Sequence, residues 1–482
     1  MSGDTFPLAG EFPTPSRDEW LSLVDKALKG APFDKMLVSR TYDGITIQPL
    51  YGRGDRPGEG DPSGFPGAAP FTRGARAAGA TAGWDVRQLH LHPDPGTCNA
   101  EIRRDIERGV TSLRLRLHAA ARRGLDSDAG GDLTGEDGVI IDRLDDLDRA
   151  LKDIDLVAAP VSLEPGAAFA AGAALMAALW RRRGIADGDA RGTFGADPLG
   201  TLAAEGALTQ GLDDALAALG ALAAATAATY GPGVRSVMVD TRPYHGAGAT
   251  SSQDLAIAMA TGVAYLRALT AAGMDIDAAC GQIAFTLAVD CNQFQSIAKL
   301  RAARRLWARV TQACGASDGA RGMVVNAETA HRMLTRRDPW VNMLRATVAA
   351  FAAGVGGADS VTVLSFDSAL GEPGELGRRM ARNTQLVLQE ESNLHRVIDP
   401  AGGAWYPEHL TDDLCTAAWA LFQEIEGKGG MAQALTSGWI GQTLDAAFAA
   451  REKNLDKRKD PLTGVSEFPN IHEAPVSPED VD

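Results

Sequence analysis

Eight short runs of apolar and β-branched residues recur along the middle of this 482-residue chain, each followed by a longer stretch with helical periodicity. They span residues 84–91, 112–117, 156–163, 191–194, 235–241, 282–289, 323–326 and 360–366. Stretches between them, such as 252–272 and 297–314, repeat apolar residues every three or four positions. Eight strands alternating with helices are typical of a (β/α)8 barrel, whose functional groups lie on the loops after the strands. We therefore predict an α/β fold built on a (β/α)8 TIM barrel.

The barrel is predicted to occupy residues 67–407 and to follow an N-terminal arm, residues 1–66. Ser16 with Glu19 three residues later forms a capping box, which predicts a helix beginning there. A short extended segment and a Gly- and Pro-rich loop complete the arm. So short a segment has little core of its own, so we expect it to lie on the barrel or on a partner chain.

The last segment, residues 408–482, is predicted to hold C-terminal helices and a tail. Helices are expected at 408–426 and 432–455, separated by a Gly-rich turn. The charged run 451–460 is interpreted as the solvated face of a helix. We expect no further folded domain after it.

Charge and hydropathy limit the classes of partner. The formal net charge is −15, which argues against a surface that binds nucleic acid or anionic lipid. The N-terminus carries no signal-like pattern, and the alanine-rich run 215–229 is too short and too mild to span a bilayer, so it is predicted to be a packing helix. We expect a cytoplasmic protein with no nucleic-acid or membrane partner.

His245 is the best candidate for chemistry from its position alone. It follows the predicted strand 235–241, so it should reach the C-terminal mouth, where barrel enzymes place acids and bases. The alternative is a hydrogen-bonded structural residue at the end of a strand. His90 and His92 are two apart on one predicted strand and could share a face, but no third ligand is apparent and no metal is expected.

A basic run within residues 297–314 has a structural interpretation. Leu300, Ala303 and Trp307 mark an apolar stripe at helical spacing. This pattern predicts a packing helix that carries its cations, among them Lys299 and Arg301, on its outer face.

Several motifs together resemble the methylmalonyl-CoA mutase family. They extend from the arm to about residue 468 and so cover nearly the whole chain. They are Asp43-Gly44-Ile45, Pro49-Leu50-Tyr51, Pro70-Phe71-Thr72-Arg73-Gly74, Tyr244-His245, residues 298–304 with Leu306-Trp307, residues 381–385, residues 399–403, and Glu426 with Gly429-Gly430-Met431.

The resemblance implies a barrel that admits a CoA chain along its axis. It also implies a radical rearrangement between methylmalonyl-CoA and succinyl-CoA that depends on adenosylcobalamin. Residues 349–357 and 465–469 look like the small subunit of the family, which is not catalytic. The D-x-H-x-x-G motif of the cobalamin-binding domain does not occur, so we expect that domain to be missing. The resemblance then implies a heterodimer in which the large, catalytic partner binds the cofactor.

Departures from the family pattern fall where the substrate is expected. Catalytic chains of the family carry a tyrosine-containing segment where this chain has residues 75–79, and a glutamine where it has Gly195. They also carry an arginine and a serine where this chain has Gln282 and Ala284. If an acyl-CoA still binds, the resemblance points to four binding residues, of which His245 would be catalytic only in an active chain. They are Arg73, Arg87, Tyr244 and His245.

Two hypotheses follow from these patterns. In the first, the chain is a stabilising small subunit with no catalysis of its own. In the second, the barrel is the catalytic subunit of a related acyl-CoA mutase and works with a separate cobalamin-binding chain. A barrel that binds CoA without chemistry is a third alternative.

Overall fold

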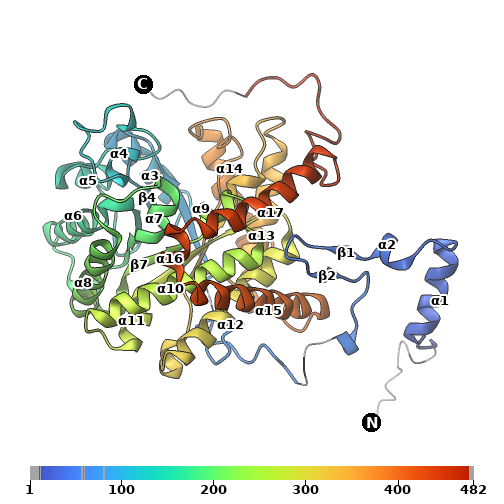
Figure 1. Ribbon diagram of the computed structural model, residues 1–482. Helices are drawn as coiled ribbons and strands as arrows, with labels where there is room; N and C mark the ends of the chain where they lie inside the picture. Colours follow the sequence, from blue (N-terminus) through green and yellow to red (C-terminus); the bar gives the residue numbers. More distant parts are fainter. Residues whose placement is uncertain (1–9, 11, 56–57, 59, 80–81, 477–482) are drawn as a thin grey trace, which may run out of the picture.

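The computed structural model describes residues 10, 12–55, 58, 60–79 and 82–476. Its centre is a closed barrel of eight parallel strands in the order β10-β3-β4-β5-β6-β7-β8-β9 (Figure 1). The predicted (β/α)8 barrel is therefore confirmed. The strands are β3 (Asp85–His90), β4 (Ser112–Arg116), β5 (Val161–Glu164), β6 (Gly192–Ala196), β7 (Val234–Asp240), β8 (Ile283–Val289), β9 (Val325–Thr329) and β10 (Ser360–Thr362).

Two strands differ from their predicted bounds. The third begins at Val161 and not near residue 156, because Asp155 accepts hydrogen bonds from the amides of Val157 and Ala158 and turns the chain there. The eighth ends at Thr362, after which the Leu364 amide donates to the Thr329 side chain. Leu156, Ala159, Val363 and Phe366 are buried in these two places without belonging to a strand, whereas Val157 is exposed, so apolar composition alone extended the predicted strands.

Helices on the outside of the barrel follow the strands. In chain order they are α3 (Pro95–Ile106), α4 (Ala119–Arg122), α5 (Leu144–Ala150), α6 (Phe169–Arg182), α7 (Pro198–Glu205), α8 (Leu212–Tyr230), α9 (Arg242–Gly246), α10 (Ser251–Ala271), α11 (Ile276–Gln282), α12 (Gln293–Ala313), α13 (Val341–Val355) and α14 (Glu375–Leu386). By length and composition α8 and α10 could cross a membrane, but α10 is a mostly buried barrel helix and α8 packs against it and against β7. The absence of a membrane partner stays a prediction.

The strands present different chemistry to their two sides. On β7, Val237 and Val239 join the apolar layer between strands and helices, whereas Met238 and Asp240 line a cavity inside the barrel. Branched apolar side chains fill the interior of most such barrels. This interior is instead largely polar, and its charged side chains need partners within the barrel.

Three cations of α12 are buried, contrary to the prediction that they lie on an outer face, whereas Arg305 is partly exposed and Arg309 is exposed. Lys299, Arg301 and Arg304 have relative exposures of 1%, 0% and 1%. Lys299 pairs with Asp254 of α10, and Arg304 donates to the Thr72 and Gly356 carbonyls. At Arg301, α15 (Trp405–Gly427), which follows the barrel, packs across α12. Arg301 there donates to Asp399 at 2.9 Å and to Glu408 at 2.7 Å.

The arm extends away from the barrel (Figure 1). It contains α1 (Arg17–Leu28), α2 (Phe33–Leu37) and a two-stranded ribbon of β1 (Ser39–Arg40) and β2 (Thr46–Ile47). The predicted capping box is present, since the Ser16 side chain accepts from the Glu19 amide and Glu19 accepts from the Ser16 amide. Neither α1 nor α2 has a buried residue.

Three helices follow the barrel where two were predicted. After α15 come α16 (Met431–Thr436) and α17 (Trp439–Asp456). The predicted second helix is interrupted at Gly438, whose φ of 79° is left-handed.

Candidate functional site

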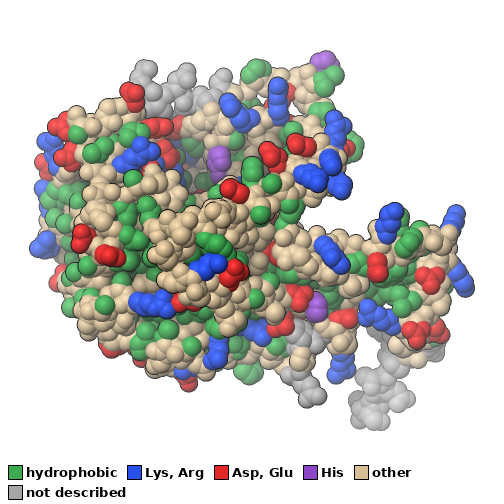
Figure 2. All heavy atoms as spheres, viewed as in Figure 1, with side chains coloured by type: hydrophobic (Ala, Val, Ile, Leu, Met, Phe, Trp, Pro, Cys, Tyr) green, Lys and Arg blue, Asp and Glu red, His purple; other side chains and the backbone are tan. Residues whose placement is uncertain are grey.

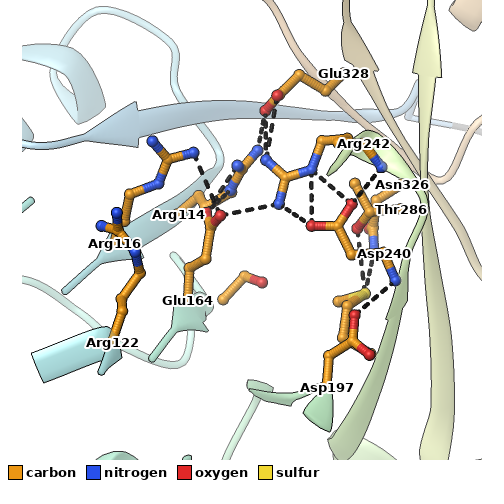
Figure 3. A network of polar contacts seen from close by, with 12 residues as sticks. Arg114, Arg116, Arg122, Glu164, Asp197, Asp240, Arg242, Thr286, Asn326 and Glu328 are labelled. Atoms are coloured by element: carbon orange, nitrogen blue, oxygen red, sulfur yellow. Dashed lines mark hydrogen bonds and ion pairs between the residues drawn. The ribbon is translucent and has the colours of Figure 1, made fainter. Parts of the chain in front are cut away.

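Three guanidinium groups and three carboxylates meet inside the C-terminal mouth of the barrel (Figure 3). We call them the mouth network. Its members come from β4, β5, the β7–α9 junction and β9, so the closure of the barrel is what brings them together. They are Arg114, Arg116, Glu164, Asp240, Arg242 and Glu328.

Glu164 is the centre of the network. Its carboxylate lies 2.7 Å from Arg114 Nη2, 3.3 Å from Arg116 Nη2 and 3.0 Å from Arg242 Nη2. Glu328, opposite, pairs with Arg114 and lies 3.2 Å from Arg242 Nη1. Asp240 accepts from Arg242 Nε at 2.9 Å. Three guanidinium groups thus face three carboxyl groups at this level of the barrel.

The network keeps Glu164 and Arg114 charged although they are removed from water, whereas burial and the nearby carboxylates of Glu164 and Asp197 raise the pKa of Asp240 well above its ordinary value. Burial opposes ionisation of Glu164, but Arg114 and Arg116 outweigh it and lower its pKa to about 2. Burial likewise disfavours the charged form of Arg114, yet Glu164 and Glu328 raise its pKa. Charges paired in this way are costly to separate, so the network is a rigid feature of the mouth.

Two cavities lie on either side of these charges. The outer one, at the mouth, has a volume of about 780 Å³, and the inner one, within the barrel, about 110 Å³. Glu164, Asp240 and Arg242 line both cavities. The mouth network therefore lies where the open mouth meets the barrel interior, and Arg122 and Glu205 line both cavities beside it.

Arg87, one of the predicted binding residues, lies deeper in the barrel than the mouth network and lines the inner cavity. Its Nε donates to Ser112 at 3.0 Å and its Nη1 donates to Asn326 at 2.9 Å. These partners belong to β4 and β9, on either side of β3 and β10, so the side chain extends across the interior. Burial lowers the pKa of Arg87 to about 10. The Arg87 guanidinium therefore links β3 to β4 and β9 through its hydrogen bonds to Ser112 and Asn326.

Tyr244 and His245 do not reach the mouth as expected. Both are buried in α9, and within the described residues neither lines the outer or the inner cavity. His245 Nδ1 lies 2.8 Å from Asp254 Oδ2, which also pairs with Lys299. Burial lowers the pKa of His245 even though Asp254 favours its charged form. The side chain from α9 that does enter the mouth is Arg242, three residues earlier.

Arg73, the remaining predicted binding residue, lies at the opposite end of the barrel. It pairs with Asp61 at 3.0 Å and with Asp399 at 3.7 Å. With Trp84 and Asp359, which precede β3 and β10, it lines a small hollow of about 60 Å³. The four predicted binding residues thus lie in three separate places, and only Tyr244 and His245 are together.

The two histidines considered for a metal are also separated. His90 ends β3 and is buried, and burial lowers its pKa to about 3. His92 lies beyond the strand and not on a shared face, and its Nδ1 accepts from the Asp94 amide at 3.1 Å. Among the described residues, no three His, Cys, Asp or Glu side chains are grouped to hold a metal ion.

The mouth network itself was missed in the sequence. A signal was present in Ser112–Arg116, where Arg114 and Arg116 alternate with leucines in a strand that is otherwise apolar. Alternation in a barrel strand places both arginines on the inner side. What the strand could not indicate is which carboxylates would meet them.

Comparison with known proteins places the chain in a family. The family model described as methylmalonyl-CoA mutase matches residues 40–482. This chain belongs to the methylmalonyl-CoA mutase family. It is 45% identical to a methylmalonyl-CoA mutase small subunit of Streptomyces virginiae, over 99% of this chain and 74% of that protein.

Other family members are more distant. The small subunit of Propionibacterium freudenreichii subsp. shermanii is 39% identical over 98% of this chain and 71% of its own length. A methylmalonyl-CoA mutase of Cereibacter sphaeroides is 32% identical over 97% of this chain and 66% of its own length. Similarity thus falls from proteins named small subunits to one named simply as the mutase.

Proposed function

We propose that this chain is the small subunit of an adenosylcobalamin-dependent methylmalonyl-CoA mutase and that it stabilises the large, catalytic subunit without carrying out the isomerisation. The observation that carries the proposal is the mouth network. A barrel that catalyses at its C-terminal mouth needs a passage between that mouth and the ligand in its interior. Here the paired side chains of Glu164, Asp240 and Arg242 occupy the place where the two cavities meet.

The mouth does not fit cofactor chemistry on a substrate held in the barrel. A radical formed over the outer cavity would face the mouth network, whose members are each held by one or more ion pairs. His245, the one candidate acid, is buried within α9, lines neither of the two described cavities and is paired with Asp254. We therefore derive no catalytic step in this chain and assign adenosylcobalamin to the partner.

The arm supports the proposal of a partner chain. Trp20, Leu23 and Val24 of α1 form the apolar stripe of a helix that has no buried residue, and Leu23 is 63% exposed. Exposed apolar helices that project from a globular body are typical of segments that pack on another chain. The names of the similar small subunits agree with a larger partner.

The test is reconstitution with the large subunit from the same organism. Purified together, the two chains should form a 1:1 complex in which cobalamin is bound to the large subunit. His245→Gln in this chain should leave the turnover of the complex within about twofold of the parent, since the side chain touches no reacting group.

The opposite result would identify this barrel as the catalyst. Turnover by this chain with a separate cobalamin-binding chain, lost in His245→Gln, would contradict the proposal. Calorimetric titration of the chain alone with CoA gives an independent measurement, and we expect no binding because Arg87 and the mouth network occupy the barrel axis.

A further inference from the structure

Basic side chains gather at the C-terminal end of α17, where they form a blue cluster on the surface in Figure 2. We call this cluster the α17 patch. It contains five cations and two acidic residues, Glu452 and Asp456, within nine positions, which leaves a local net charge of about +3 on a chain whose total is −15. The cations are Arg451, Lys453, Lys457, Arg458 and Lys459.

Cations without an ion pair occur elsewhere in the described chain, for example Lys152 and Arg309, but the patch gathers five of them within nine positions. More than half of the described arginines have a carboxylate oxygen within 4 Å, including exposed ones such as Arg182. In the described part of the chain, none of the five patch cations has such a partner. An acidic protein offers many carboxylates, so a group of cations left without them is available for an external anion.

The patch adjoins the point where the arm leaves the body. Asn454 Nδ2 donates to the Tyr42 hydroxyl at 2.9 Å, and that hydroxyl also bonds to Asp460. Tyr42 lies between β1 and β2 of the arm. Figure 2 shows the surface hollowed between the arm and the body beside this junction.

The surroundings of the patch have the composition of a protein interface. Phe448, one turn before the patch on α17, is 44% exposed, and Tyr42 is 39% exposed. Exposed aromatic side chains next to arginine are enriched at protein–protein interfaces.

We propose that the α17 patch docks an acidic segment of the large subunit, which lies in the hollow between the arm and the body. This inference rests on the proposed function and adds the chemistry of the contact. The patch steers the encounter of the two chains, so the association rate should fall as salt rises.

The test reverses four exposed cations in Lys453→Glu/Lys457→Glu/Arg458→Glu/Lys459→Glu. None of the four side chains is buried, so the fold should be retained, which circular dichroism and the melting temperature check. By surface-binding kinetics with the immobilised large subunit, we expect the dissociation constant to rise about tenfold or more. We also expect most of the salt dependence of the association rate to be lost.

A matched variant controls for net charge. Arg108→Glu/Lys152→Glu/Arg181→Glu/Arg309→Glu makes the same change of charge at four exposed cations on other helices and loops. It should bind the large subunit within about threefold of the parent. If the two quadruple variants weaken binding equally, the effect is general repulsion and the inference is wrong.

The remaining outcomes separate this inference from the proposed function. If the parent binds the large subunit and the patch variant binds equally well at every salt concentration, the inference is overturned and the proposed function stands. If the parent does not bind the large subunit at all, both fail. Patch-dependent binding to duplex DNA or to phosphatidylserine vesicles, in place of the large subunit, would overturn the inference in favour of another anion.

Discussion

Arg242 on α9 and Glu328 on β9 lie 3.2 Å apart inside the barrel mouth, although 86 positions separate them in the chain. Both are mostly buried, with side-chain exposures of 14% and 9%. Their contact joins the loop after β7 to the end of β9, at the level where a (β/α)8 enzyme would hold its reacting group. This ion pair therefore lies in the mouth and also links α9 to β9.

Removing one carboxylate from this network should destabilise the barrel. In Glu328→Gln the guanidinium groups of Arg114 and Arg242 lose a charged partner in a buried place, and we expect a loss of about 3 kcal/mol in the free energy of unfolding. Denaturant unfolding measures it. Asp145→Asn, which breaks an exposed pair with Arg182, is the control and should leave the free energy of unfolding nearly unchanged. Equal effects of the two changes would show that the network is not stabilising.

The join between the barrel and α15 depends on Arg301. Its guanidinium is fully buried and bonds to Asp399, Glu408 and Ser63, so Arg301→Met leaves the buried Glu408 without a cation and Asp399 with only the more distant Arg73. We expect a loss of about 3–5 kcal/mol in the free energy of unfolding.

Limited proteolysis gives a second measurement for Arg301→Met. Cleavage should begin near α15, which the variant no longer holds on α12. Arg305→Met is the matched control, because Arg305 is 32% exposed and pairs with the half-exposed Asp412 on the same two helices. Resistance of Arg301→Met equal to that of the control would contradict the role of Arg301.

Stability should depend on pH through Glu164. Its pKa in the folded protein is about 2, below the value of about 4.3 for glutamate in an unfolded chain. A lowered folded-state pKa stabilises the protein fully above about pH 4.5, and this contribution is lost as the pH falls toward 2. Glu164→Gln should therefore be less stable than the parent at pH 7, and the difference should shrink below pH 4.5. A difference in unfolding free energy that stays constant from pH 7 to pH 2.5 would contradict this assignment.

Deletion of residues 1–38 should separate folding from assembly. Because α1 and α2 have no buried residue, we expect the free energy of unfolding of the barrel to change by less than about 1 kcal/mol. Gel filtration with the large subunit should nevertheless show a weakened complex. An unchanged complex would mean that the arm makes no contribution to it.

The limits of sequence interpretation are clear at α12. The periodicity of Leu300, Ala303 and Trp307 correctly indicated the helix and its apolar face. It also indicated an exposed basic face, which was wrong for Lys299, Arg301 and Arg304 because elements distant in the chain cover them, as α15 covers Arg301. A local pattern reports which face is apolar, but not whether a polar face will meet water.

The candidate site divides in the same way. The sequence by itself determined the barrel and most of its strand positions, since alternation and helical periodicity depend on residues close together in the chain. The mouth network was decided only by tertiary structure, because Arg114 meets Glu164 and Glu328 across 50 and 214 positions. The same closure turned His245 toward Asp254 and brought Arg242 into the mouth. Which side chain of a loop faces the barrel axis depends on how the strands close around it, and no local pattern carries that information.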